Sequence, residues 1–289
     1  MESEKMTEGS AATAPHPMAA ILDDLCALAR AAGAVEKRIF EGDFTAEIKQ
    51  DGSPVTIADQ KAEEMIITKL AELTPDIPFL GEESVAAGDI PDISGGTYWC
   101  VDPLDGTKEF VGGGGEFTVN IALMENFIPV LGVIYLPMRD VLYAAAGSGK
   151  GRGYVYMQQA GTSEKTPLTV RQPPEKGLTV IESRRHGNPE AIQRFISGYK
   201  VAELAARSSS LKFCAIAEGV ADLYPRLAPT CEWDTAAGDA ILRAAGGHVL
   251  ALDGTPLRYG KKTEQFLNPF FAACSDALKD SIAAAAKKR

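Results

Sequence analysis

Two stretches near the start of the chain place apolar residues at helical spacing. In the first, the apolar positions begin after Met18 and repeat every three or four residues from Ile21 to Ile39. The second runs over 57–73 and carries Asp59 in its first turn. The pattern therefore predicts two amphipathic helices.

Strand-like runs follow at 117–124, 130–135 and 141–145, and short turns join them. Such an arrangement is typical of an antiparallel meander. The glycine-rich segment 147–153 lacks the G-x-x-x-x-G-K-[ST] pattern of a phosphate-binding loop and follows a meander strand. We therefore interpret it as a hairpin turn.

Beyond a proline-containing segment at 172–177 the pattern changes. Strand-like runs at 178–181, 201–204 and 220–224 alternate with helical segments near 189–197, from Ser210 and from Thr235. This alternation is typical of α/β architecture. We predict an α/β protein with a disordered tail at 1–17, an α+β lobe at 18–172 and an α/β lobe at 173–289.

The composition limits which kinds of partner the protein can bind. The chain has 289 residues, 45% of them apolar, and a net charge of −10, with a pI near 4.9. Such an acidic protein is poorly suited to nucleic acid or an anionic membrane, because both attract basic surfaces. The start of the chain lacks the features of a signal peptide, and no run approaches the roughly 20 apolar residues of a membrane span. We expect a cytoplasmic protein that is at most peripheral on the inner face of the cell membrane.

The five cysteines are odd in number and lie far apart, mostly in apolar runs. They are typical of reduced core residues, and no C-x-x-C or histidine spacing predicts a zinc site. The oligomeric state stays open, with a homodimer as one option.

The segment 102–107, Asp-Pro-Leu-Asp-Gly-Thr, carries the strongest chemical signal. The apolar run 99–101 predicts the end of a buried strand, and Pro103 keeps the chain from entering a helix at once. Asp102 and Asp105 can then converge on one cation. Oxygen ligands of this kind suit Mg²⁺ or Mn²⁺ better than Zn²⁺.

Gly106 permits a sharp turn, and Thr107 stands where a following helix offers free N–H groups to a phosphate. Taken alone, such a motif is more often a turn with helix-capping aspartates. Two further acidic segments reverse that preference. Glu82 and Glu83 follow the apolar run 77–81, and Asp234 follows the run 231–233, as expected of carboxylates at the ends of strands.

If these carboxylates share one pocket, their repulsion raises their pKa values and destabilises the fold unless cations neutralise them. The sequence therefore predicts a site for more than one metal ion.

Three blocks of the chain resemble the inositol monophosphatase superfamily of Mg²⁺-dependent, Li⁺-sensitive phosphatases. They are G-E-E-S at 81–84, W-C-V-D-P-L-D-G-T-K-E-F at 99–110 and W-D-T-A-A-G at 233–238. The resemblance covers nearly the whole chain after about residue 18. It implies a layered αβαβα sugar-phosphatase fold, with metals held mainly by the first lobe and substrate by the second.

The resemblance also implies roles for individual residues. The metal ligands would be Glu82, Asp102, the Leu104 carbonyl, Asp105 and Asp234, holding two or three Mg²⁺ ions for which Mn²⁺ can substitute. Thr107 and Asp59 would orient and deprotonate the attacking water, and Glu83 would support that water or a third metal. Without the resemblance, Asp59 is better explained as a first-turn acid favoured by the helix dipole, and Glu83 as an exposed loop acid.

Within the superfamily, four segments resemble the bacterial 3′(2′),5′-bisphosphate nucleotidases of sulfate assimilation. They are T-K-E-F at 107–110, S-S-L-K-F-C at 209–214, L-Y-P-R at 223–226 and F-L-N-P at 266–269. This branch hydrolyses the 3′-phosphate of adenosine 3′,5′-bisphosphate, or of its sulfated form, to leave the 5′-phosphate. The substrate-binding residues would be Gly106, Thr107, Lys108, Ser183, His186, Ser209, Lys212, Arg226 and Asp234. For a single residue of this set, a solvated surface position or a helix cap is equally common.

Two alternatives stay open. An inositol monophosphatase or broad sugar phosphatase is favoured by G-E-E-S-V-A-A-G at 81–88, but Leu227 stands where inositol phosphatases carry a substrate-binding glutamate. A catalytically silent metal or nucleotide sensor is disfavoured, because a sensor does not need Asp59 and Thr107.

Overall fold

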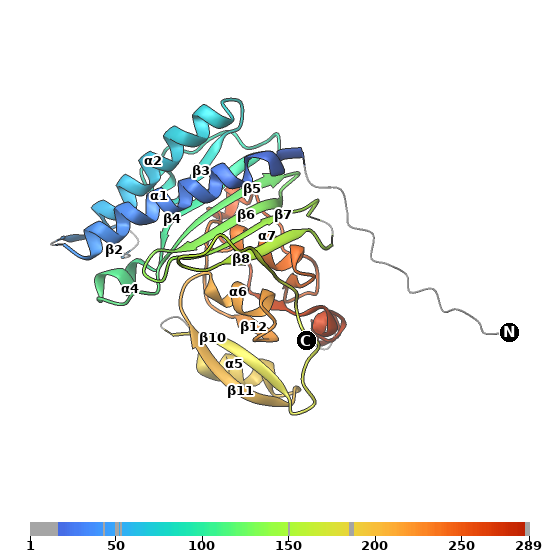
Figure 1. Cartoon of the computed structure of the whole chain (residues 1–289). Coiled ribbons are helices and arrows are strands. Elements are labelled where there is room, and N and C mark those ends of the chain that lie inside the picture. Colours follow the sequence, from blue (N-terminus) through green and yellow to red (C-terminus); the bar gives the residue numbers. More distant parts are fainter. Residues whose placement is uncertain are drawn as a thin grey trace.

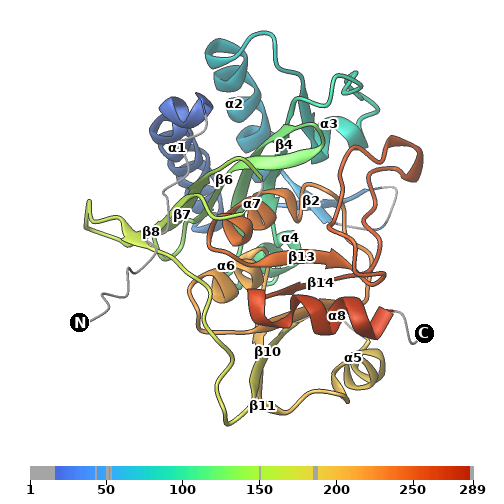
Figure 2. The same ribbon diagram turned by 90° about the vertical axis from the view of Figure 1, so that its right-hand side faces the viewer.

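The computed structural model describes residues 17–42, 44–49, 52, 54–149, 151–184 and 188–286. Their helices and sheets alternate in five layers. Figure 1 shows α1 and α2 over one face of the first sheet and α6 and α7 on its other side, and Figure 2 shows α5 and α8 outside the second sheet. The predicted αβαβα architecture is confirmed. The predicted tail lies almost entirely outside the described residues.

The first layer consists of the two helices that the apolar spacing predicts. They are α1 (Leu22–Phe40), after a 3₁₀ turn at Pro17–Ile21, and α2 (Ile57–Leu73). A short hairpin of β1 (Ala46–Ile48) and β2 (Pro54–Thr56) lies between them. Leu25 of α1 and Ile66 of α2 are buried in one cluster with strand residues such as Val119 and Val133, so the apolar faces cover the first sheet.

The first sheet has seven strands in chain order. They are β3 (Phe79–Gly81), β4 (Tyr98–Asp105), β5 (Thr118–Glu125), β6 (Ile128–Leu136), β7 (Val141–Ala146), β8 (Tyr154–Gln158) and β9 (Thr166–Pro167). Only β3 and β4 pair in parallel, so the predicted meander is confirmed. The glycine-rich segment at 147–153 joins the antiparallel strands β7 and β8, as the hairpin interpretation requires.

One strand is longer than predicted. β4 does not end at Val101 but continues through the Asp-Pro-Leu-Asp segment, and its pairing with β5 becomes irregular between Asp102 and Asp105. An irregularity of this kind turns side chains away from strict alternation. The side chains of both aspartates therefore project from the same end of β4.

The second sheet has five strands in the order β11-β10-β12-β14-β13. Its strands are β10 (Leu178–Ser183), β11 (Val201–Arg207), β12 (Leu223–Arg226), β13 (His248–Ala251) and β14 (Phe271–Cys274). The helices around it are α5 (Pro189–Ile196), α6 (Leu211–Ala217), α7 (Ala236–Ala244) and α8 (Lys279–Ala286), with 3₁₀ turns at Lys262–Glu264 and Asp276–Leu278. The expected run 220–224 is a strand only from Leu223. The run 231–233 is not a strand, because Cys231 forms a single bridge, to Leu267.

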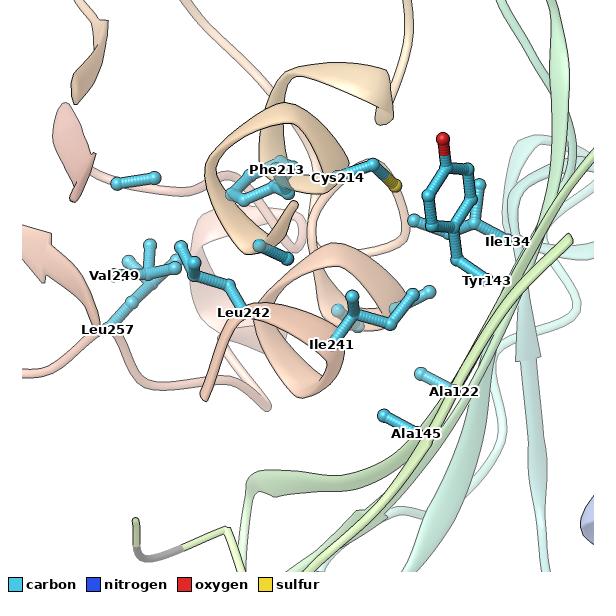
Figure 3. Close-up of a cluster of buried hydrophobic side chains, with 14 of the residues drawn as sticks. Ala122, Ile134, Tyr143, Ala145, Phe213, Cys214, Ile241, Leu242, Val249 and Leu257 are labelled. Carbon is cyan, nitrogen blue, oxygen red and sulfur yellow. The ribbon is translucent and has the colours of Figure 1, made fainter. Parts of the chain in front are cut away.

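The middle layer joins the two sheets. Figure 3 shows Ile241 and Leu242 of α7 and Phe213 of α6 between Ala122 and Ala145 of the first sheet and Val249 of the second. One buried cluster therefore includes residues from both sheets. Docking of α7 also fixes Asp234, which precedes it by two residues.

All five cysteines are free thiols, and four of them are buried, as expected of reduced core residues. A search of the helices within the described ranges finds none with the length and apolar character to span a membrane.

The packing of α7 on β6 leads to a stability prediction. A Cβ at Gly132 would lie 2.6 Å from the Ala237 carbonyl oxygen and 2.8 Å from the Ala240 Cβ. Overpacking of this kind costs about 1–3 kcal/mol, so Gly132→Ala should lower the free energy of unfolding by that amount in urea titrations. Gly198→Ala is the control, since a Cβ there meets nothing within 4 Å. Equal stability of the two variants would show that α7 shifts freely on the sheet.

Candidate metal and phosphate site

A cleft of about 840 Å³ is lined by residues from both sheets and from the segments that connect their strands. Its wall combines the end of β4, the first turn of α4 (Thr107–Val111), the first turn of α6 and the loop before α7. The cleft brings together all three acidic blocks that the sequence singles out.

Glu82, Asp102 and Asp234 form the centre of the site. Each offers a carboxylate oxygen, and these atoms lie within 4.8 Å of one another. The parallel register of β3 and β4 explains why Glu82 and Asp102 lie close together. Gly81 pairs with Val101, and the residues that follow this pair are Glu82 and Asp102. Glu82 is the first residue of α3 (Glu82–Ala86). Asp234 reaches them from the turn before α7. A carboxylate cluster of this kind suits a hard divalent cation.

Asp105 lines the same cleft but stands beside this trio. Its Oδ2 accepts hydrogen bonds from the Ser210 hydroxyl at 3.0 Å and the Asn120 amide at 3.4 Å. The Ser210 Oγ also lies 3.0 Å from the Asp234 carbonyl oxygen and accepts from Asn120 at 2.9 Å. Ser210 therefore ties both aspartate segments to the start of α6.

The electrostatics of the cluster are unfavourable without a cation. Burial, followed by repulsion from Glu82 and Asp105, raises the pKa of Asp102 well above its ordinary value. Burial and the charge of Asp105 raise the pKa of Asp234 to about 7. Burial and the charge of Glu82 raise the pKa of Glu83 to about 7. The fold thus gathers negative charge that a bound cation would relieve.

Lys49, which the sequence analysis missed, partly relieves that charge. Its Nζ lies 2.7 Å from an oxygen of Glu82 and 2.6 Å from one of Glu83. Burial lowers the pKa of Lys49, but the two carboxylates outweigh that effect and raise it. No local pattern marks this lysine, because only the fold brings the loop after β1 to α3.

Asp59 and Thr107 meet as the resemblance implies. The Thr107 hydroxyl lies 3.2 Å from both Asp59 Oδ1 and the Leu104 carbonyl oxygen. Asp59 Oδ2 accepts from the backbone N–H and the hydroxyl of Thr56, both at 2.8 Å, and so caps α2. Asp59 therefore stands in the first turn, as the helix-dipole explanation predicts, and it also caps α2 and contacts Thr107 on the cleft wall.

Gly106 is needed where the chain turns into α4. Its φ is 102°, in the left-handed region that favours glycine, and a Cβ there would lie 2.5 Å from the Ser209 hydroxyl. That hydroxyl is itself 2.9 Å from the Asp105 carbonyl oxygen and 3.0 Å from that of Glu116. The side chain of Ser209 thus links the segment before α6 to the backbone at Asp105 and Glu116.

The other expected substrate residues lie on the cleft wall where the structure describes them: Lys108, Ser183, Lys212 and Arg226. Burial lowers the pKa of Lys212 to about 8, although the nearby Asp105 opposes this. The guanidinium of Arg226 donates to the carbonyl oxygens of Ala228 and Pro229, at 3.0 and 2.6 Å. His186 lies outside the described residues.

Asn268 of the F-L-N-P block at 266–269 holds the turn that carries Asp234. Asn268 Nδ2 donates to the Cys231 carbonyl at 2.7 Å and the Thr235 hydroxyl at 3.0 Å, and the Cys231 N–H donates to Asp234 Oδ2 at 2.8 Å. The Glu232 carboxylate is not directed at the cleft, since it accepts from the N–H groups of Gly260 and Lys261.

Asn120, which the sequence analysis missed, had one signal in the sequence: it is a polar side chain within an otherwise apolar strand.

The chain is similar to known proteins over most of its length. The chain is 42% identical over 253 residues to the 3′(2′),5′-bisphosphate nucleotidase CysQ of Escherichia coli K12, covering 87% of this chain and 98% of that protein. The crystal structure of CysQ from Bacteroides thetaiotaomicron, described as a bacterial member of the inositol monophosphatase family, has 38% identity and a TM-score of 0.71, covering 88% of this chain and 98% of that one.

A structure of inositol monophosphatase from Anabaena sp. PCC 7120 shares the fold, with 24% identity and a TM-score of 0.71, covering 94% of this chain and 97% of that one. The family model described as inositol monophosphatase family matches residues 18–288. With the acidic blocks in one cleft and the match extending over nearly its whole length, the chain belongs to the inositol monophosphatase family.

Proposed function

We propose that this protein is an Mg²⁺-dependent phosphatase that hydrolyses the 3′-phosphate of adenosine 3′,5′-bisphosphate to give AMP and phosphate. The observation that carries the proposal is that one cleft holds a carboxylate cluster together with two largely buried cationic side chains, Lys212 and Arg226. A substrate with two phosphates can use both features. The identity to CysQ along nearly its full length supports the same choice.

The donor set fits the proposed metal. Glu82, Asp102 and Asp234 would hold one Mg²⁺, and Asp105 with the Leu104 carbonyl would contribute to a second, with Mn²⁺ as a substitute. Glu83 would help to hold a third. When bound, the metal ions would polarise the phosphoryl group and stabilise the charge of the leaving ribose oxygen.

Thr107 and Asp59 would activate the attacking water. When the Thr107 hydroxyl donates to Asp59 Oδ1, its oxygen can accept a hydrogen bond from a water in the cleft. The water proton would then pass to the Thr107 oxygen as the Thr107 proton moves to the Asp59 carboxylate. Asp59 is held by Thr56 and cannot turn away. The attack would then be direct, without a covalent enzyme intermediate.

Lys212 would contact the phosphate that is not cleaved, with Arg226, Ser183 and Lys108 nearby on the cleft wall. Leu227, at the position of the inositol phosphatase glutamate, packs against the core of the second lobe and offers no carboxylate to a sugar hydroxyl. This favours the nucleotide over inositol phosphate. A role in sulfur assimilation and nucleotide recycling would suit a cytoplasmic protein.

A substrate panel with Mg²⁺ tests the proposal. Wild type should show a much higher kcat/KM for adenosine 3′,5′-bisphosphate than for inositol 1-phosphate. The reverse order would make the protein an inositol or general sugar phosphatase. No phosphate release from either substrate would favour a sensor.

Replacing Lys212 tests the contact with the second phosphate. A charge-assisted contact is worth about 1.5–3 kcal/mol, so Lys212→Met should lower kcat/KM for the bisphosphate by roughly 10- to 100-fold and leave inositol 1-phosphate nearly unchanged. Lys69→Met, on the exposed face of α2, is the matched control. An equal loss on both substrates would assign Lys212 to the fold or the metals.

Thr107→Ala should slow hydrolysis by about 100-fold at saturating Mg²⁺, because water activation is lost. Adding Asp59→Asn should cost little more, since the two residues act as a unit. Thr107→Ser keeps the hydroxyl and should retain most of the activity. A loss confined to the apparent affinity for Mg²⁺ would make Thr107 a structural residue only.

The raised pKa values predict how Mg²⁺ stabilises the fold. A carboxyl whose pKa is higher in the folded state binds its proton more tightly there, so the stability of the metal-free protein falls as pH rises from about 4 to about 7. Bound Mg²⁺ removes the repulsion. The increase in Tm caused by Mg²⁺, relative to a chelator, should therefore be larger near about pH 8 than near about pH 5.5.

Asp234→Asn should reduce that pH dependence, and Asp76→Asn, on the surface, should not. Equal Mg²⁺ effects at both pH values in wild type would contradict the assignment of the raised pKa values to the metal site.

A further inference from the structure

A further carboxylate lies behind the metal site and touches its backbone. Glu63 of α2 is 3% exposed. Its Oε2 accepts the N–H of Glu83 at 2.9 Å, and its Oε1 accepts the N–H and hydroxyl of Ser84 at 2.7 and 2.6 Å. Both oxygens are therefore used within the protein, and neither belongs to the three-carboxylate cluster.

We propose that Glu63 is a positioning residue that sets the direction of the carboxylates of Glu82 and Glu83. The first N–H groups of a helix have no partner within the helix, so their acceptor determines how its first turn is oriented. Here that first turn consists of Glu82, Glu83 and Ser84. Lys49 contacts the side chains of the two glutamates, and Glu63 accepts the backbone N–H groups of Glu83 and Ser84.

The position of Glu63 on α2 connects two parts of the site. It lies four residues after Asp59, so both side chains project from the same face of one helix. Asp59 reaches Thr107, and Glu63 reaches α3. A single rigid element thus sets the spacing between the proposed water-activating pair and the metal-binding glutamates.

Gly81 gives independent support. A Cβ at this position would lie 2.7 Å from both Cδ and Oε2 of Glu63, and 2.4 Å from the ring of Phe79. The φ of Gly81 is −116°, which any residue can adopt. The glycine is therefore required for space, and the space that it leaves is partly occupied by the Glu63 carboxylate.

The inference rests on the proposed metal-dependent function, and its test uses metal alone. Calorimetric titration of the protein with Mn²⁺ should show that Glu63→Ala weakens metal binding by about 10-fold or more, the usual effect of losing an outer partner of a ligand. Glu63→Gln should fall between, because its amide oxygen can accept one N–H but its NH₂ group cannot accept the other. Glu64→Ala, an exposed neighbour on α2, should bind as wild type does.

Kinetics separate positioning from a general loss of fold. Glu63→Ala should raise the Mg²⁺ concentration needed for half-maximal rate by the same factor as the Mn²⁺ dissociation constant, and should change kcat at saturating Mg²⁺ by less than about threefold. The Tm of metal-free Glu63→Ala is measured beside it. A variant that binds metal normally despite a lower Tm would overturn the inference.

Gly81→Ala supplies a second route to the same change. Alone it should weaken Mn²⁺ binding, because the new methyl group displaces Glu63. Combined with Glu63→Ala its effect on Mn²⁺ binding should be clearly less than additive, because the carboxylate that it displaces is already absent and only the contact with the Phe79 ring remains. Additive losses would overturn the inference. Absence of metal binding by wild type would instead refute the proposed function, and a failed substrate panel with normal metal binding would leave the inference standing.

Discussion

The repulsion among carboxylates at the C-terminal end of β4 is the constraint on which the rest of the molecule depends. Glu82, Asp102 and Asp234 come from three separate segments, yet their oxygens lie within 4.8 Å of one another. Such an arrangement costs free energy that must be offset by packing elsewhere or by bound cations. The parallel pairing of β3 with β4 holds two of these groups, and the docking of α7 against β6 holds the third.

The same constraint explains the polar contacts around the cluster. Ser210 and Asn120 bind Asp105, the backbone of Cys231 binds Asp234, and Lys49 binds the two glutamates. These contacts hold Glu82, Asp105 and Asp234 at the cleft wall. The protein therefore holds a preorganised set of oxygen donors, and the binding of cations would release the electrostatic free energy that folding has stored.

The cleft combines acidic side chains with basic ones, which include Lys49 and Lys108 near the first sheet. The first sheet and its connections supply most of the acidic groups, while α6 and β12 of the second sheet supply Lys212 and Arg226. A net charge of −10 would repel a polyanionic substrate from the molecule as a whole. Local cations and proposed metal ions overcome this only within the cleft, which supports a small phosphorylated substrate and disfavours an extended nucleic acid.

The sequence by itself determined the α/β class, the two amphipathic helices, the meander and the acidic blocks, because helical spacing, strand runs and turn residues are local properties of the chain. The layered αβαβα arrangement was implied by the family resemblance. It did not determine that β4 runs through Asp105, that 231–233 is not a strand, or that Ser209 holds a backbone instead of pointing freely into the cleft. The sequence pattern also did not indicate the roles of Lys49 and Glu63. Their partners lie 20 to 34 residues away, and no spacing rule connects a loop lysine or a helix glutamate to a turn that only the tertiary structure brings beside it.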